Sequence, residues 1–409
     1  MRKKASKILL LALAVIFSFS GNALALSARE LVEIYMNLTR RKPANVKTWV
    51  NLSKAYSQLA QEALDFSQYQ QAEAFLRKPL SLDSTNIEAL AQLAQVKSAY
   101  HKFEESIAIA TKILSKAPKN PSAWGALGDA FLELGKYKQA DSCYKKMYNL
   151  DKELYSLVRL SHLACEKGNF SQAVSFMKKA IQNGEKEGYF FCEQAWANVQ
   201  LGKLYLSRGK LDESLKAFEK ALNLLPNYLP ALEHKGRVLA LKGDMNSAIE
   251  IYEKVSQKAV DPEPKSALAK LYLEVGKKEA ADSLLKLVRE QYEVYLKSDI
   301  KAFNSRIAKF YLQWNINLEQ ALELAQKELE IRQDIHTYDL LAWAYYKNGE
   351  PQKAWENISL ALSKNNKDAE ILYHAAVIAE ALGKQRESKK YFSQAKSINP
   401  LSEKMYAEN

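Results

Sequence analysis

The fold is decided by the stretch from Pro121 to Lys152, PSAWGALGDAFLELGKYKQADSCYKKMYNLDK. In its first half, large and small apolar residues recur at intervals of three and four, as on one face of an amphipathic helix. Gly135 interrupts this pattern, and an aromatic–small–aromatic series follows it. The stretch therefore predicts a helical hairpin whose two helices approach closely where small residues face each other. The pattern is carried by Trp124, Leu127, Gly128, Phe131, Tyr137, Ala140, Tyr144 and Met147.

The same pattern recurs about every 34 residues over nearly the whole chain. If Trp124 is position 4 of its unit, positions 4, 7, 8 and 11 form the packing stripe of each first helix. Two units depart from this register. The unit that begins at Trp49 has a late second helix, and the unit around Phe310 has its two helices out of phase. The polar helical stretch 289–301 precedes that second unit, which predicts an extended helix or a joint between two parts of the stack.

This period and this order of side-chain sizes resemble the tetratricopeptide repeat (TPR). The resemblance implies an all-α fold, a right-handed α-α superhelix of about nine to ten helical hairpins. We expect a capping helix at 26–45, a repeat stack at 46–290, a helical joint at 291–301, a second stack at 302–400 and a tail at 401–409.

The last hundred residues carry a narrower resemblance. The run from Asp334 to Asp339, followed by the run from Leu341 to Tyr345, is similar to the C-terminal part of a large group of bacterial TPR proteins. So are the pairs Tyr373–His374 and Asn399–Pro400. That group has no agreed biochemical role, so this resemblance implies a bacterial TPR protein without naming its activity. Together with the N-terminal segment described next, it implies an exported bacterial type of uncharacterised role.

The first 25 residues predict a signal peptide. Four basic residues precede an apolar run from Ile8 to Phe19, and Ala23–Ala25 supplies a small-x-small cleavage pattern. The run is shorter than the roughly 20 apolar residues that span a bilayer. We expect export to the periplasm or the medium, cleavage near Ala25 and no integral span in the mature chain. The alternative is an uncleaved N-terminal anchor.

Composition and charge limit the partners. The chain is 47% hydrophobic and 26% charged, which is typical of a folded protein. Its formal net charge is +12, but the basic residues alternate with acidic ones instead of forming a stripe, so we expect no nucleic-acid binding. Cys143, Cys165 and Cys192 are odd in number and widely spaced, which favours buried thiols over a disulfide framework.

The resemblance also places candidate binding residues. In TPR proteins the first helices line a concave groove, and positions 2, 5, 9 and 12 point into it because the stripe is used for packing. The clamp with which some TPR domains hold chaperone C-termini is missing, since Val50, Lys54, Ala91 and Gln95 stand at the corresponding places. The C-terminal end of the groove is aromatic, and aromatic residues often dominate binding energy. Alternatively, these rings pack against neighbouring repeats. The candidate groove residues are Asp129, His162, Lys203, Glu233, Arg237, Lys270, Trp343, Tyr346 and Tyr373.

No motif indicates catalysis. The chain has five histidines and lacks HExxH, GxSxG, P-loop and GxGxxG patterns. His336 and Asp339 form the best local pair, which we interpret as a helix-start residue near a solvated acid. We therefore expect no enzyme, cofactor or metal. The predicted function is an exported scaffold that binds a partner protein or peptide in its groove, in an envelope or polysaccharide-export assembly. The alternative is a cell-wall glycan-binding protein that uses the groove aromatics.

Overall fold

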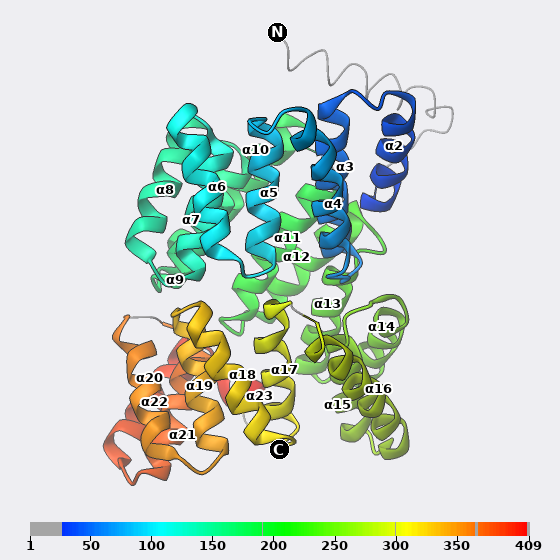
Figure 1. Cartoon of the computed structure of the whole chain (residues 1–409). Coiled ribbons are helices and arrows are strands. Elements are labelled where there is room, and N and C mark those ends of the chain that lie inside the picture. The colour runs from blue at the N-terminus through cyan, green and yellow to red at the C-terminus, as the bar shows by residue number, and fades with distance from the viewer. Residues whose placement is uncertain (1–26, 190, 299, 365–366, 407–409) are drawn as a thin grey trace.

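A computed structural model describes residues 27–189, 191–298, 300–364 and 367–406. The predicted signal peptide lies outside the described residues. The described chain confirms the all-α superhelix: a lone helix, α2 (Ala28–Arg41), precedes ten helical hairpins (Figure 1). The hairpins are α3 (Val46–Glu62) with α4 (Gln68–Leu82), α5 (Ile87–Ala99) with α6 (Phe103–Lys116), α7 (Pro121–Glu133) with α8 (Tyr137–Leu150), α9 (Leu154–Glu166) with α10 (Phe170–Glu187), α11 (Phe191–Leu206) with α12 (Leu211–Leu224), α13 (Leu229–Lys242) with α14 (Met245–Lys258), α15 (Glu263–Glu274) with α16 (Lys278–Leu296), α17 (Asn304–Gln313) with α18 (Leu318–Ile331), α19 (Ile335–Lys347) with α20 (Pro351–Ser363), and α21 (Ala369–Ala381) with α22 (Gln385–Ile398).

Local sequence explains where the helices begin and how closely they pack. The side chains of Asn45, Asn86 and Asn120 each accept a hydrogen bond from an amide in the first turn of α3, α5 and α7. At the crossing of α7 and α8, a Cβ on Gly128 would lie 2.4 Å from Cε1 of Tyr144. A larger residue would have to displace the Tyr144 ring, which agrees with the predicted close approach of small residues.

A long helix lies at each irregular point of the repeat: α3 within the first irregular unit, and α16 just before the second. α3 has 17 residues, and the turn after it holds Leu64 at φ +49°. α16 has 19 residues and reaches into the predicted joint, where a 3-10 turn, η1 (Lys301–Phe303), leads into α17. The ring centroids of Tyr292 on α16 and Phe310 on α17 lie 5.1 Å apart, so the apolar core continues across this segment. In the predicted tail, α23 (Ser402–Tyr406) packs on α21 and α22.

The superhelix is wound tightly enough for its second turn to touch its first. Figure 1 shows two tiers, with α3 to α11 in one and α13 to α23 in the other. Successive hairpin turns of the first tier meet successive loops of the second. A Cβ on Gly135 would lie 2.5 Å from the backbone oxygen of Gln333, and one on Gly209 would lie 2.5 Å from Oδ1 of Asn399. Between them, the turn at Gly168 meets Lys367. We call this row of contacts the seam.

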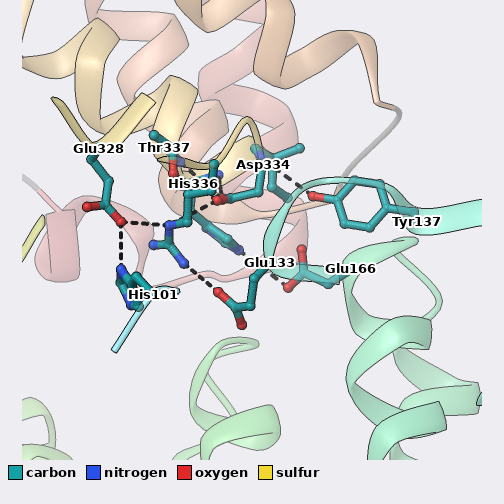
Figure 2. Close-up of polar contacts among 10 residues, drawn as sticks. His101, Glu133, Tyr137, Glu166, Glu328, Asp334, His336 and Thr337 are labelled. Carbon is teal, nitrogen blue, oxygen red and sulfur yellow. Dashed lines mark hydrogen bonds and ion pairs between the residues drawn. The ribbon is translucent and has the colours of Figure 1, made fainter. Parts of the chain in front are cut away.

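Charged side chains concentrate at the seam around Arg332, which follows α18 (Figure 2). Nη1 of Arg332 lies 2.5 Å from Oε2 of Glu133, and its Nε lies 2.9 Å from Oε1 of Glu328. Glu328 is fully buried, and Nδ1 of His101 lies 3.1 Å from the same Oε1. The contacts of Glu328 are close but lack the alignment of hydrogen bonds, so the guanidinium of Arg332 acts on this carboxylate through its charge. A buried carboxylate needs such partners.

His101 also has an unusual backbone. It occupies the place that glycine holds in most of the hairpin turns and lies in the left-handed region at φ +57°. Residues other than glycine rarely adopt this conformation, although histidine does so more often than most. The conformation accompanies the contact of its ring with Glu328 on the other tier.

The first hairpin contacts α11, which closes the first tier into a ring, and it also contacts the second tier. The amide nitrogen of Asp261 donates to the backbone oxygen of Leu64 at 2.8 Å, between hairpins that lie far apart in the chain. Nε2 of Gln58 on α3 lies 2.7 Å from Sγ of Cys192 on α11. The concave face of α3 to α11 therefore curves around an interior space.

Candidate binding site inside the superhelix

A cavity of about 580 Å³, partly open to solvent, lies between the first helices of the ring. This volume is within the range of ordinary ligand sites, roughly 300–1,000 Å³. One wall, from α3 and α5, is rich in carboxamides and carries Gln58, Gln61, Gln92 and Gln95. Carboxamides can donate and accept hydrogen bonds together, as a peptide backbone requires.

Two of the candidate groove residues, Asp129 and His162, line this cavity. Arg159 holds Asp129 through two nitrogens, with Nε 2.8 Å from Oδ1 and Nη2 2.7 Å from Oδ2. The hydroxyl of Tyr144 donates to the same Oδ1 at 2.9 Å. Such a bidentate pair fixes both side chains. Burial, together with Lys203, lowers the pKa of His162 to about 4, so its ring is neutral at pH 7.

Three further candidates lie together beyond the cavity. Burial raises the pKa of Glu233 to about 8, and the negative charge of Glu263 also raises it. The positive charges of Arg237 and Lys203 lower this pKa but do not outweigh the burial. Lys203 keeps contact with solvent, but the surrounding protein and Arg237 lower its pKa, whereas Glu233 raises it. Lys203, Glu233 and Arg237 thus form a mixed-charge group. Lys270 is half-buried on α15 and makes none of these contacts in the described part of the chain.

The three aromatic candidates are packed together at the C-terminal end. The Trp343 ring lies between Tyr346, with centroids 4.9 Å apart, and His374, at 4.1 Å. Only 8% of Trp343 is exposed. Tyr373 is half-buried, with its ring centroid 5.4 Å from that of Phe392 and 6.3 Å from that of Tyr406. Tyr346 is also half-buried.

Two residues that line the cavity are missing from the list of candidate groove residues, although they stand at a position that the repeat register directs into the groove. Tyr155 on α9 and Trp196 on α11 both stand at position 2 of their units, and both line the cavity. Cys192 lines it too, and it is buried. Burial raises the pKa of the Cys192 thiol to about 12, so the thiol is not activated as a nucleophile. Among the described residues, no three metal-ligating side chains gather into a group.

Comparison with family models confirms the repeats. Tetratricopeptide repeat models match residues 121–153, 205–271 and 369–400. The chain is therefore an α-helical solenoid that contains tetratricopeptide repeats. It is 24% identical to a TPR repeat-containing protein of Methanocaldococcus jannaschii, over 87% of this chain and 70% of that protein.

Other relatives match over smaller shares of their own length. The TPR repeat-containing protein YpiA of Bacillus subtilis is 27% identical over 59% of this chain and 54% of its own. The BBSome complex member BBS4 of Bos taurus is 24% identical over 60% of this chain and 47% of its own. The chain thus spans about half the length of these two relatives.

Solved structures show similar folds at low identity. PilF of Pseudomonas aeruginosa is 20% identical with a TM-score of 0.42, covering 52% of this chain and 97% of its own. Human IFIT1 in a complex with PPP-AAAA is 15% identical with a TM-score of 0.47, covering 90% and 94%. Throughout the described residues, the helices fall short of the length and apolar character that crossing a bilayer requires.

Proposed function

We propose that this chain is a non-enzymatic protein-interaction scaffold that holds a segment of a partner protein inside its superhelix. The cavity of about 580 Å³ inside the ring, partly open to solvent, carries this proposal. Its wall of glutamines suits an extended backbone, because each carboxamide can pair with both N–H and C=O groups. The mixed-charge group around Lys203 and the half-buried rings of Tyr346 and Tyr373 would extend the binding surface along the concave face.

The place of action we propose is outside the cytoplasm, in an envelope or polysaccharide-export assembly. The basic start, apolar run and Ala23–Ala25 of the sequence support this proposal. The test is to express the full chain and a form that lacks residues 2–25, then fractionate the cells. We expect only the full chain to leave the cytoplasm, with a mature N-terminus near Leu26. Retention of both forms in the cytoplasm would contradict export.

Site-specific crosslinking tests the scaffold role. A photoreactive residue replaces Gln95 in the cavity wall or Tyr346 at the C-terminal end, and the matched control replaces Lys220, which is exposed on α12. We expect Gln95 to form an adduct with one partner, mapped by mass spectrometry to a single continuous segment. Labelling equal to that at Lys220, or none, would argue against a partner in the cavity.

A further inference from the structure

Exposed apolar side chains gather around one hairpin of the second tier, α15 with α16. In the described part of the chain nine large apolar side chains are exposed, and five of them lie between residues 260 and 294: Val260, Leu273, Val275, Leu287 and Val294. Leu287 and Val294, both on α16, are 51% and 64% exposed. Isolated exposed apolar residues are ordinary, but a group of them indicates a surface that another molecule covers.

α16 has two apolar faces. One face packs into the core through Ala281, Leu285, Val288 and Tyr292. The other face carries residues at alternating intervals of four and three, which is the spacing of the contact positions in a coiled coil. We call this second set the outer stripe, and it consists of Ala280, Leu284, Leu287, Gln291 and Val294. The side chain of Gln291 donates to the backbone oxygen of Val260, so Val260 lies beside the outer stripe.

The outer stripe fits another α-helix better than a bilayer. α16 has 19 residues and is about 28 Å long, and the coiled-coil spacing keeps the stripe in line over that length. Helices that lie on a membrane surface carry mainly basic residues on their polar face. Along α16, acidic and basic residues alternate instead. Figure 1 shows α16 at the outer edge of the second tier, where a second helix can approach it.

The charges beside the outer stripe are self-complementary in the antiparallel direction. Glu279, Lys286, Glu290 and Lys297 are exposed along one line, on the side of the stripe away from the buried face. Within the described chain, none of these four side chains forms an ion pair. If a second α16 crosses antiparallel at the level of residue 288, Glu290 faces Lys286 of the partner subunit, and Glu279 faces Lys297 of the partner subunit. One register therefore satisfies both pairs, whereas a parallel arrangement would set each charge beside its own copy.

We propose that two copies of this chain form a symmetric dimer in which α16 packs antiparallel on α16 of the second copy through the outer stripe. The same surface serves both subunits, as a two-fold axis requires. The apolar stripe supplies the contact, and the exposed ion pairs, which contribute little affinity, fix the direction. The dimer is independent of the proposed function, because α16 lines no part of the cavity. Its consequence is a scaffold with two cavities, which holds a partner with two matching segments more tightly than either cavity alone.

Analytical ultracentrifugation of the mature chain over a dilution series tests the dimer. We expect reversible dimers, and a dissociation constant at least about tenfold higher for Leu287→Glu, which buries two like charges near the crossing. The matched control is Leu82→Glu on α4, since Leu82 is 53% exposed and Leu287 51%. A monomeric mass at every concentration up to about 1 mM, where even weak contacts populate a complex, overturns the proposal. So does a dimer that both variants weaken equally.

Charge reversal tests the antiparallel register. Lys286→Glu makes both members of one pair acidic, and Glu290→Lys makes both basic, so we expect each variant alone to dimerise several-fold more weakly than the natural chain. A mixture of the two variants restores opposite charges across the interface, so the heterodimer should be tighter than either homodimer. Native mass spectrometry, with one variant labelled with ¹⁵N, measures the three species. Heterodimers no more abundant than random pairing of subunits would overturn the antiparallel contact.

Two other occupants of the outer stripe give different results. A photoreactive residue in place of Ala280, which is exposed, should crosslink to α16 of a second copy near Val294 of the partner subunit. An adduct with a different protein instead would overturn the proposal. Binding of a monomeric chain to phosphatidylglycerol vesicles, lost in Leu287→Glu, would assign the stripe to a lipid surface and also overturn it. The crosslink at Gln95 reports on the cavity alone, so the proposed function and the dimer stand or fall separately.

Discussion

Oε2 of Glu133 lies 2.5 Å from Nη1 of Arg332, although 199 residues separate them in the chain. Arg332 also faces the fully buried carboxylate of Glu328. Replacing Arg332 with alanine leaves that buried charge poorly compensated, which costs about 3–5 kcal/mol in other proteins. We expect a loss of this size in the free energy of unfolding, measured by urea denaturation. Arg289→Ala, at an exposed site, is the control; a loss no larger than the control's would mean that the seam does not hold the tiers.

Alanine substitutions at two glycines with the same backbone conformation can distinguish the loss of a seam contact from backbone strain in a turn. Gly135 has φ +69° and Gly349 has φ +77°, so alanine is strained at either site by about 1–2 kcal/mol. A Cβ on Gly135 would also meet Gln333, whereas a Cβ on Gly349 would meet nothing within 4 Å. We expect Gly135→Ala to lower the melting temperature clearly more than Gly349→Ala. Equal losses would show that the contact with Gln333 is absent in solution.

The crossing of α7 and α8 provides a packing test. Ala140 is fully buried. Leucine there overpacks the core and should lower the free energy of unfolding by about 1–3 kcal/mol. Its neighbour Gln139 is exposed, so Gln139→Leu should change it little. Chemical denaturation of both variants measures the difference, and an unchanged Ala140→Leu would mean that the repeat register is wrong.

His336 gives the seam a dependence on pH. Partial burial lowers the pKa of His336, but the carboxylates of Glu166, Asp368 and Asp334 outweigh it and raise the pKa to about 10 from 6.5. The folded state therefore holds a proton that the unfolded chain releases near pH 6.5. The stabilisation is complete below that pH and is lost as the pH rises toward about 10.

The measurement for this residue is the melting temperature of the natural chain and of His336→Gln at pH 7 and pH 10. We expect the advantage of the natural chain to shrink between these two values. His162→Gln is the matched control, because His162 is neutral throughout this range and its effect should stay constant. An advantage that persists unchanged at pH 10 would exclude the ion pair of His336 with Glu166.

Much of the fold follows from short-range pattern. Spacing of large and small residues locates the hairpins, and the glycine at 128 faces Tyr144 because the two helices need close approach. The cavity was partly predictable: the rule that named Asp129 and His162 also gives Tyr155 and Trp196. The seam was not, because it depends on how the small rotation of each repeat accumulates over a full superhelical turn. Nothing local in the loop at Gln333 indicates a contact with Gly135.

The seam also limits how the number of repeats can change in evolution. Gly135 and Gly168 meet loops that lie roughly six repeat lengths later. An open solenoid can gain or lose a unit by duplication or deletion within its gene, because each unit touches only its neighbours. Here, one additional hairpin between two contacting partners would shift the second tier by one unit, so that each of these hairpin turns of the first tier would face a different loop from the one it contacts now. We therefore expect the number of repeats between two contacting partners of the seam to be preserved among relatives that share it, and changes in repeat number to fall outside that interval.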